Sequence, residues 1–135
     1  MESNLTVSIV LISMIFCHIV DDYYLQGVLA KMKQRQWWKD NCPDERYKCD
    51  FMAALFAHAF SWAFMIQLPL VGYYIIVRHM IPQAVPVMFV LNVLVHALVD
   101  NEKANRKSIN LIVDQIVHMI QIIVTLSVVE LSWVL

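Results

Sequence analysis

The sequence is short of charged residues. They make up 16% of the 135 positions, while hydrophobic residues make up 60%. An ordinary soluble domain is about a quarter charged, so this composition argues against one and indicates membrane-spanning segments. The formal net charge is −1, and no Lys/Arg-rich patch with interleaved aromatic residues is present. The charge pattern therefore excludes an electrostatic basis for nucleic-acid binding.

Cysteine and glycine are also scarce. The three cysteines, Cys17, Cys42 and Cys49, cannot all pair within the chain. The last two are spaced more widely than in a CxxC metal knuckle, so we expect reduced thiols. The only glycines, Gly27 and Gly72, form no Gly-xxx-Gly face. The sequence therefore allows a homo-oligomer but predicts no interface for it.

The hydrophobic residues are gathered into four long runs. The first lacks a basic n-region and a small-residue cleavage site, so we expect it to remain as a span. About 20 apolar residues are needed for a helix to cross the hydrocarbon core of a bilayer. The sequence predicts an all-α fold, a single membrane domain over residues 1–135 built as a four-transmembrane-helix bundle. The predicted spans cover about residues 5–24, 51–77, 81–99 and 109–135.

Lysine and arginine are concentrated in two of the connecting segments. Segment 31–50 carries six of the ten and segment 101–108 carries three. The positive-inside rule then places both segments in the cytoplasm and both chain termini outside. Trp37 and Trp38 lie among the charges of the first segment, which is typical of a segment against anionic headgroups. A docking surface for a partner protein is the alternative.

Four short polar signatures lie inside or beside the apolar runs. A spacing of four residues places two side chains on one face of a helix. Histidine and aspartate are costly in hydrocarbon, so they usually mark a site there. With the orientation given above, all four signatures lie in the cytoplasmic third of the bilayer, where facing helices of a bundle would bring them together. The signatures are His18-xxx-Asp22, a lone His58, Asn92-xxx-His96-xxx-Asp100 and Asp114-xxx-His118.

These residue types suit a divalent metal ion, with zinc as the best match. The donors exceed the four of a tetrahedral ion, so the surplus would orient ligands or bind a second ion. Asp22 and Asp100, at the wetter edge, are the predicted catalytic bases, and Asp21 is the alternative to Asp22. The predicted metal ligands are His18, His58, His96, Asp114 and His118. The predicted supporting residues are Gln26, Asn92, Gln115 and Lys103.

Each of these residues also has an ordinary structural explanation. A single membrane histidine such as His58 often only hydrogen-bonds across helices. We expect His79 to be an interfacial residue, Glu130 to extend toward water, and Lys103 to be a solvated lysine at a helix end. Asp114 is the most informative residue, because a carboxylate well inside a span needs a cation, a proton or a strong donor.

The combined pattern resembles an uncharacterised family of small bacterial and phage integral membrane proteins. The resemblance covers nearly the whole chain. It implies a multi-span protein of the bacterial inner membrane, often encoded by a bacteriophage, and implies no established activity. A looser similarity links the His/Asp motifs to membrane-bound metal-dependent hydrolases, by analogy alone. The pattern is His18-xxx-Asp22-xxx-Gln26, His58, His96-xxx-Asp100-xx-Lys103 and Asp114-Gln115-xx-His118, with Lys31 and Lys33.

The sequence is compatible with three functions. The leading hypothesis is a metal-dependent hydrolase that acts on a lipid or amphiphile at the cytoplasmic leaflet, with Lys103 available to receive an anionic headgroup. The second is a proton or divalent-cation channel or transporter, although the outer halves of the spans are nearly all apolar. The third is a non-catalytic phage membrane factor with a structural metal site, whose segment 31–50 binds a host protein.

Overall fold

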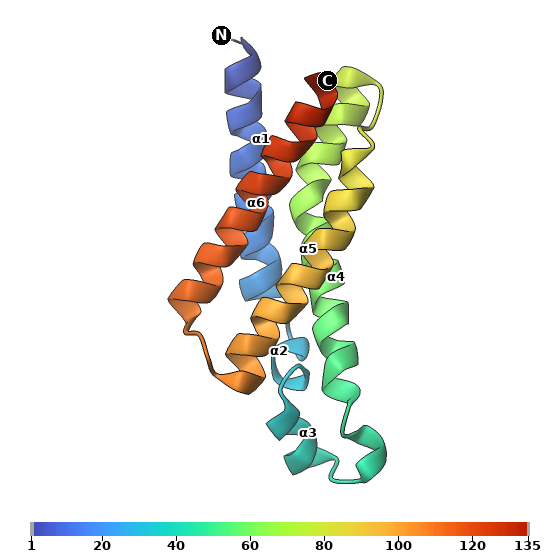
Figure 1. Cartoon of the computed structure of the whole chain (residues 1–135), viewed down its shortest axis with the longest axis vertical. Helices are drawn as coiled ribbons and strands as arrows, with labels where there is room; N and C mark the ends of the chain where they lie inside the picture. The colour runs from blue at the N-terminus through green and yellow to red at the C-terminus, as the bar shows by residue number, and fades with distance from the viewer. Residues whose placement is uncertain (1, 135) are drawn as a thin grey trace.

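Four long antiparallel helices form the body of the molecule (Figure 1). The computed structural model describes the backbone of residues 2–134 and the side chains of residues 5–134. Both ends of the chain lie at one end of the bundle, and the longer connections lie at the other (Figure 1). The prediction of an all-α, four-helix bundle is confirmed. The long helices are α1 (Glu2–Ile19), α4 (Asp50–Tyr73), α5 (Ala84–Asn101) and α6 (Leu111–Val134).

Wider π-helical turns extend three of these helices. They are η1 (Val20–Leu25) after α1, η3 (Tyr74–Arg78) after α4 and η4 (Glu102–Arg106) after α5. With these turns, four helical segments within residues 2–134 are long and apolar enough to cross a membrane. The third one reaches further than its apolar run because η4 continues the helix through charged residues. The segments are Leu5–Leu25, Glu45–Arg78, Ala84–Arg106 and Leu111–Val134.

The connection between the first two spans is folded rather than extended. It contains α2 (Leu29–Met32), α3 (Arg35–Asn41) and the 3-10 turn η2 (Glu45–Tyr47). Trp38 packs with Phe51 and Leu55, and its indole N–H donates to the Met32 carbonyl at 2.6 Å. Trp38 is therefore largely enclosed by the protein, which differs from the surface position expected of it.

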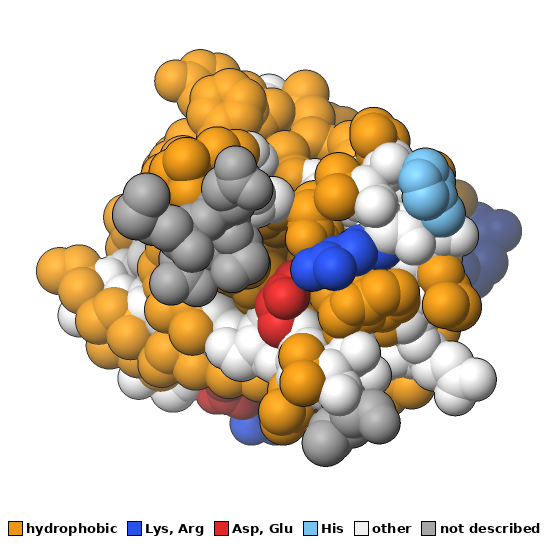
Figure 2. Space-filling view, turned by 90° about the horizontal axis from the view of Figure 1, so that it is seen from above, with side chains coloured by type: hydrophobic (Ala, Val, Ile, Leu, Met, Phe, Trp, Pro, Cys, Tyr) orange, Lys and Arg blue, Asp and Glu red, His pale blue; other side chains and the backbone are white. Residues whose placement is uncertain are grey.

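The outward faces of the helices are apolar. Phe60 is 56% exposed, Leu98 is 65% exposed and Ile116 is 53% exposed. A helix on the surface of a soluble protein carries polar side chains at such positions. Hydrophobic side chains also dominate the end of the bundle that carries the termini (Figure 2). The exposed surface thus suits hydrocarbon on the sides of the bundle.

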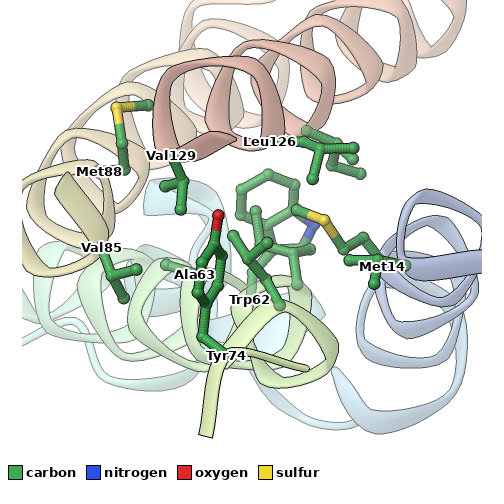
Figure 3. Close-up of a cluster of buried hydrophobic side chains, with 12 residues drawn as sticks. Met14, Trp62, Ala63, Tyr74, Val85, Met88, Leu126 and Val129 are labelled. Carbon is green, nitrogen blue, oxygen red and sulfur yellow. The ribbon is translucent and has the colours of Figure 1, made fainter. Parts of the chain in front are cut away.

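The interior is divided into two parts, which we call the apolar half and the polar half. The apolar half lies toward the termini, and Trp62, Met14 and Leu126 pack within it (Figure 3). The polar half lies toward the connections and contains most of the buried polar residues. Its histidines and aspartates are His18, Asp21, His58, His96, Asp100, Asp114 and His118, all at most 1% exposed.

Replacing Ile66 with alanine should destabilise the bundle. Ile66 is fully buried in the apolar half, so the substitution leaves a cavity and should lower the free energy of unfolding by about 2 kcal/mol. Leu68→Ala is the matched control, because Leu68 is 48% exposed on the outer face of the same helix. Thermal unfolding in detergent micelles measures both. Equal losses in the two variants would contradict this packing.

Candidate metal site

Six side chains from four helical elements converge in the polar half. They form three overlapping groups, and within each group one donor atom of every residue lies within 4.8 Å of the others. Asp22, His96 and His118 each belong to two groups, so the groups make one continuous cluster. Such groups could hold a metal ion. They are Asp22–His58–His96, His96–Asp100–His118 and Asp22–Asp114–His118.

The distances between donor atoms match those around a metal ion. Metal–ligand bonds of 2.0–2.1 Å in a tetrahedron place neighbouring donors about 3.3–3.5 Å apart. The Nε2 atoms of His58 and His96 are 3.2 Å apart, and His58 Nε2 is 3.2 Å from Asp22 Oδ1 and 3.5 Å from Asp100 Oδ2. The lone pairs of both imidazoles can therefore face one shared point.

His118 faces two carboxylates without hydrogen-bonding to either. Its Nε2 lies 3.4 Å from Asp114 Oδ1 and 3.7 Å from Asp100 Oδ1. Each of the three atoms is buried and lacks a hydrogen-bond partner among the described residues. A proton would draw such atoms to about 2.7–3.2 Å, whereas a cation between them fits the longer separations. Buried polar atoms rarely lack partners, so these three indicate a ligand.

A hydrogen-bond chain fixes the tautomer of His118. Gln121 donates its amide N–H to the backbone carbonyl of Asn92 at 3.3 Å, which identifies the other amide atom as oxygen. That oxygen, Oε1, lies 3.2 Å from His118 Nδ1 and can only accept. In the neutral imidazole, His118 Nδ1 must therefore carry the proton, which leaves Nε2 free to offer its lone pair. Metal-binding histidines commonly have such an outer partner.

A second chain orients His18 and Gln115. The indole N–H of Trp62 donates to His18 Nδ1 at 2.7 Å, so the His18 proton is on Nε2 and faces Gln115 Oε1 at 3.0 Å. The Gln115 amide then donates to Asp22 Oδ2 at 3.0 Å and to Asp114 Oδ2 at 3.1 Å. His18, predicted as a ligand, thus lies outside the three groups, with both ring nitrogens occupied.

The π-helical turn η1 directs two consecutive aspartates into the polar half. In an α-helix, consecutive side chains point about 100° apart, and the wider π turn reduces that difference. Asp22 Oδ1 reaches Nε2 of His58, while Asp21 Oδ2 lies 3.6 Å from the opposite ring nitrogen, Nδ1. Ser61 donates to Asp21 at 2.6 Å. Asp21 and Asp22 therefore contact the same imidazole from two sides.

Two lysines reach the carboxylates from the connections. Lys33, only 4% exposed, donates to Asp100 Oδ2 at 2.5 Å, and Lys103 forms an ion pair with Asp114. Asn105 holds the segment around Lys33, since it donates to the Lys33 carbonyl and accepts from the Arg35 N–H. Lys103 is therefore bonded within the site rather than solvated.

The charges of the site do not cancel. With neutral imidazoles, four carboxylates against two ammonium groups leave two negative charges in a buried region. Uncompensated buried charge is costly, and one divalent cation would neutralise it. The charged residues are Asp21, Asp22, Asp100 and Asp114 with Lys33 and Lys103.

The predicted supporting residues all lie at the site. Gln26 donates to Asp22, and Asn92 hydrogen-bonds with both Gln121 and Thr125. The sequence pattern did not single out Gln121, although it lies three residues after His118 on the same helix face. It also missed the roles of Trp62 and Lys33. The family pattern includes Lys33, but its place in the site could not be predicted, because it comes from a separate segment of the chain.

Two residues outside the site have ordinary roles. His79 is exposed, with a left-handed backbone (φ 56°) just after η3, at the opposite end of α4 from the cluster. Glu130 is partly exposed near the end of α6 and accepts a hydrogen bond from Tyr74 at 3.1 Å.

The comparisons with known proteins identify a family without identifying an activity. Neither a curated protein nor a solved structure matches the chain. One family model, described as a protein of unknown function (DUF3307), matches residues 10–135, which include every residue of the candidate site. This chain therefore belongs to the DUF3307 family of proteins of unknown function.

Proposed function

We propose that this protein is a membrane-embedded metalloprotein and a metal-dependent hydrolase of a lipid or other amphiphile. The supporting observation is the open arrangement at His118, where a bare ring nitrogen and two carboxylate oxygens face one another without partners. Imidazole and carboxylate donors suit zinc best among the common divalent ions. When bound, such an ion would acidify a water molecule and stabilise an oxyanion.

The residues of the site divide into ligands and a base. We assign His58, His96 and His118 with Asp100 and Asp114 as the donors available to the ion. Asp100 and Asp114 are at most 1% exposed. The Asp22 side chain, at 5% exposed, is less enclosed than theirs, and it accepts from Gln115 at the edge of the bundle. Asp22 is therefore the better placed general base, and His18 acts by holding Gln115.

A hydrolase fits the interior better than a channel does. A conduction path needs polar groups through the full thickness of the membrane. Here the stacked rings of Trp62 and His96, 4.2 Å apart, border the polar half, and Trp62 packs on its other side within the apolar cluster of Figure 3. That arrangement supports a site that ends inside the bundle.

The orientation follows from the loop charges. Nine of the ten lysines and arginines belong to the connections at the polar end, which favours the cytoplasmic side for that end. We therefore place the chain in a bacterial inner membrane with both termini outside, so that the site opens toward the cytoplasmic leaflet.

Protein purified in detergent should contain about one divalent ion per chain, as its uncompensated charge suggests. Asp114→Asn and His118→Gln should lose the ion, because each removes a donor with little change in shape. His79→Gln, at the exposed histidine, should retain it. Elemental mass spectrometry of the folded proteins gives the stoichiometry. A folded wild-type protein without metal would falsify the proposal.

Gln121→Leu should weaken metal binding about 10-fold to 100-fold, the usual effect of removing an outer partner of a ligand. Gln121→Glu keeps an acceptor for His118 Nδ1 and should bind more tightly than the leucine variant. Gln67→Leu is the control, since Gln67 is a buried glutamine (3% exposed) outside the metal-ligand groups. Competition with a chelating dye measures the affinities. If the Gln67 and Gln121 variants weakened metal binding equally, Gln121 would not act by holding His118 in its Nδ1-protonated form.

An assay of lipid hydrolysis distinguishes an enzyme from a transporter and from a protein with a purely structural metal site. Vesicles of phosphatidylethanolamine and phosphatidylglycerol would carry the protein and a fluorogenic lipid ester. Cleavage should require the metal, and Asp22→Asn should slow it about 100-fold while the ion remains bound. Proton or divalent-cation flux in the same vesicles, with no cleavage, would support the transport alternative. Bound metal with neither activity would leave a structural site.

A further inference from the structure

A lateral groove runs between α1 and α6 and reaches the metal site. Two adjoining cavities, of about 540 and 470 Å³, share Tyr23, Gln115 and Met119 as lining residues. We call their union the α1–α6 groove. Residues of α1, η1 and α6 line these cavities, and the lining includes the exposed side chains of Ile19, Tyr23 and Ile116, so the groove lies on the side of the bundle.

The walls of the groove are apolar and its floor is polar. Ile15 and Ile19 line one side, and Ile116 and Ile123 line the other. Gln115 lines both cavities, and its amide donates to Asp22 and Asp114. A single side chain therefore separates the groove from two carboxylates of the site.

The cavities between α4 and α5 provide a comparison. One is lined by Phe64, Leu68 and Phe89, among others, and a second by Phe56 and Leu94, among others. Both are apolar and face outward, yet neither includes a histidine or aspartate of the candidate site. Apolar cavities thus also occur elsewhere on this bundle. The α1–α6 groove differs from those between α4 and α5 because it contacts the candidate site through Gln115.

The lining indicates a ligand with an apolar chain and a polar group. Hydrocarbon fills the apolar length, while Gln115 and His18 offer hydrogen bonds at one point of it. Tyr23 and Tyr24, 57% and 77% exposed, lie at the connection end of the groove, and tyrosine is enriched at the level of lipid headgroups. A glycerophospholipid lying in its own leaflet has its ester groups near that level.

We infer that the α1–α6 groove binds one acyl chain of a bilayer phospholipid and places its ester group against Gln115. The inference rests on the proposed function, since it gives the hydrolase its substrate class and its direction of access. The ester would reach Asp22 and the metal-binding cluster from the lipid phase by displacing the Gln115 side chain. No passage through the folded connection around Lys33 is then required.

Photolabelling tests the inference. The protein would be reconstituted in vesicles containing a phosphatidylglycerol analogue whose diazirine is on the acyl carbon next to the ester. Peptides from residues 15–24 and 111–123 should be labelled severalfold more than the peptide around Leu68. Met119→Trp fills the groove and should reduce that labelling severalfold. Ile116→Trp, at an exposed position, is a second variant should the first not fold. Leu68→Trp, in the α4–α5 cavity, should change nothing.

The outcomes separate the inference from the proposed function when metal content is measured in the same samples. Equal labelling of both faces, or labelling unchanged by both groove variants, overturns the inference even if metal is bound. Selective labelling without bound metal supports phospholipid binding in the groove and overturns the hydrolase. Selective labelling with bound metal supports both.

Discussion

The burial of four aspartates inside a bundle with apolar outer faces is the constraint on which the rest of the structure depends. Each carboxylate needs a compensating group. Lys33 and Lys103 supply two, and hydrogen bonds from Ser61 and the glutamines distribute the remainder. What is left over is a double negative charge and a set of imidazoles directed toward it. With neutral imidazoles, the electrostatics of this region and its donor chemistry therefore both favour a bound divalent cation.

Trp62 links the two halves of the interior. Its indole ring packs in the apolar half, its N–H donates to His18, and its face stacks on His96. Packing in one half therefore sets the positions of donors in the other. His18 and His96 are therefore held in place by a neighbour on another helix as well as by their own backbone.

The sequence predicts the helices and most residues of the candidate site for simple reasons. Long apolar runs leave little choice of fold, and a spacing of four residues identifies a shared face, as with His96 and Asp100 or Asp114 and His118. It could not find what depends on geometry beyond the ideal α-helix. The π-helical turn that directs both Asp21 and Asp22 inward breaks the assumed spacing. Lys33 enters the site only because a connection folds back onto the bundle, and no periodicity encodes that return.

The closure of the interior at Trp62 has an electrical consequence in an energised membrane. Most of the voltage drop across a bilayer occurs in the region of low dielectric constant, which in this protein is the apolar half. The polar half, with its charged side chains, would stay near the potential of the compartment that its connections face. An ion reaching the cluster from that compartment would cross little of the field. The fraction of candidate sites that hold an ion would then depend on the ion activity on one side of the membrane. The titratable groups of the polar half would not form a path for protons across the membrane.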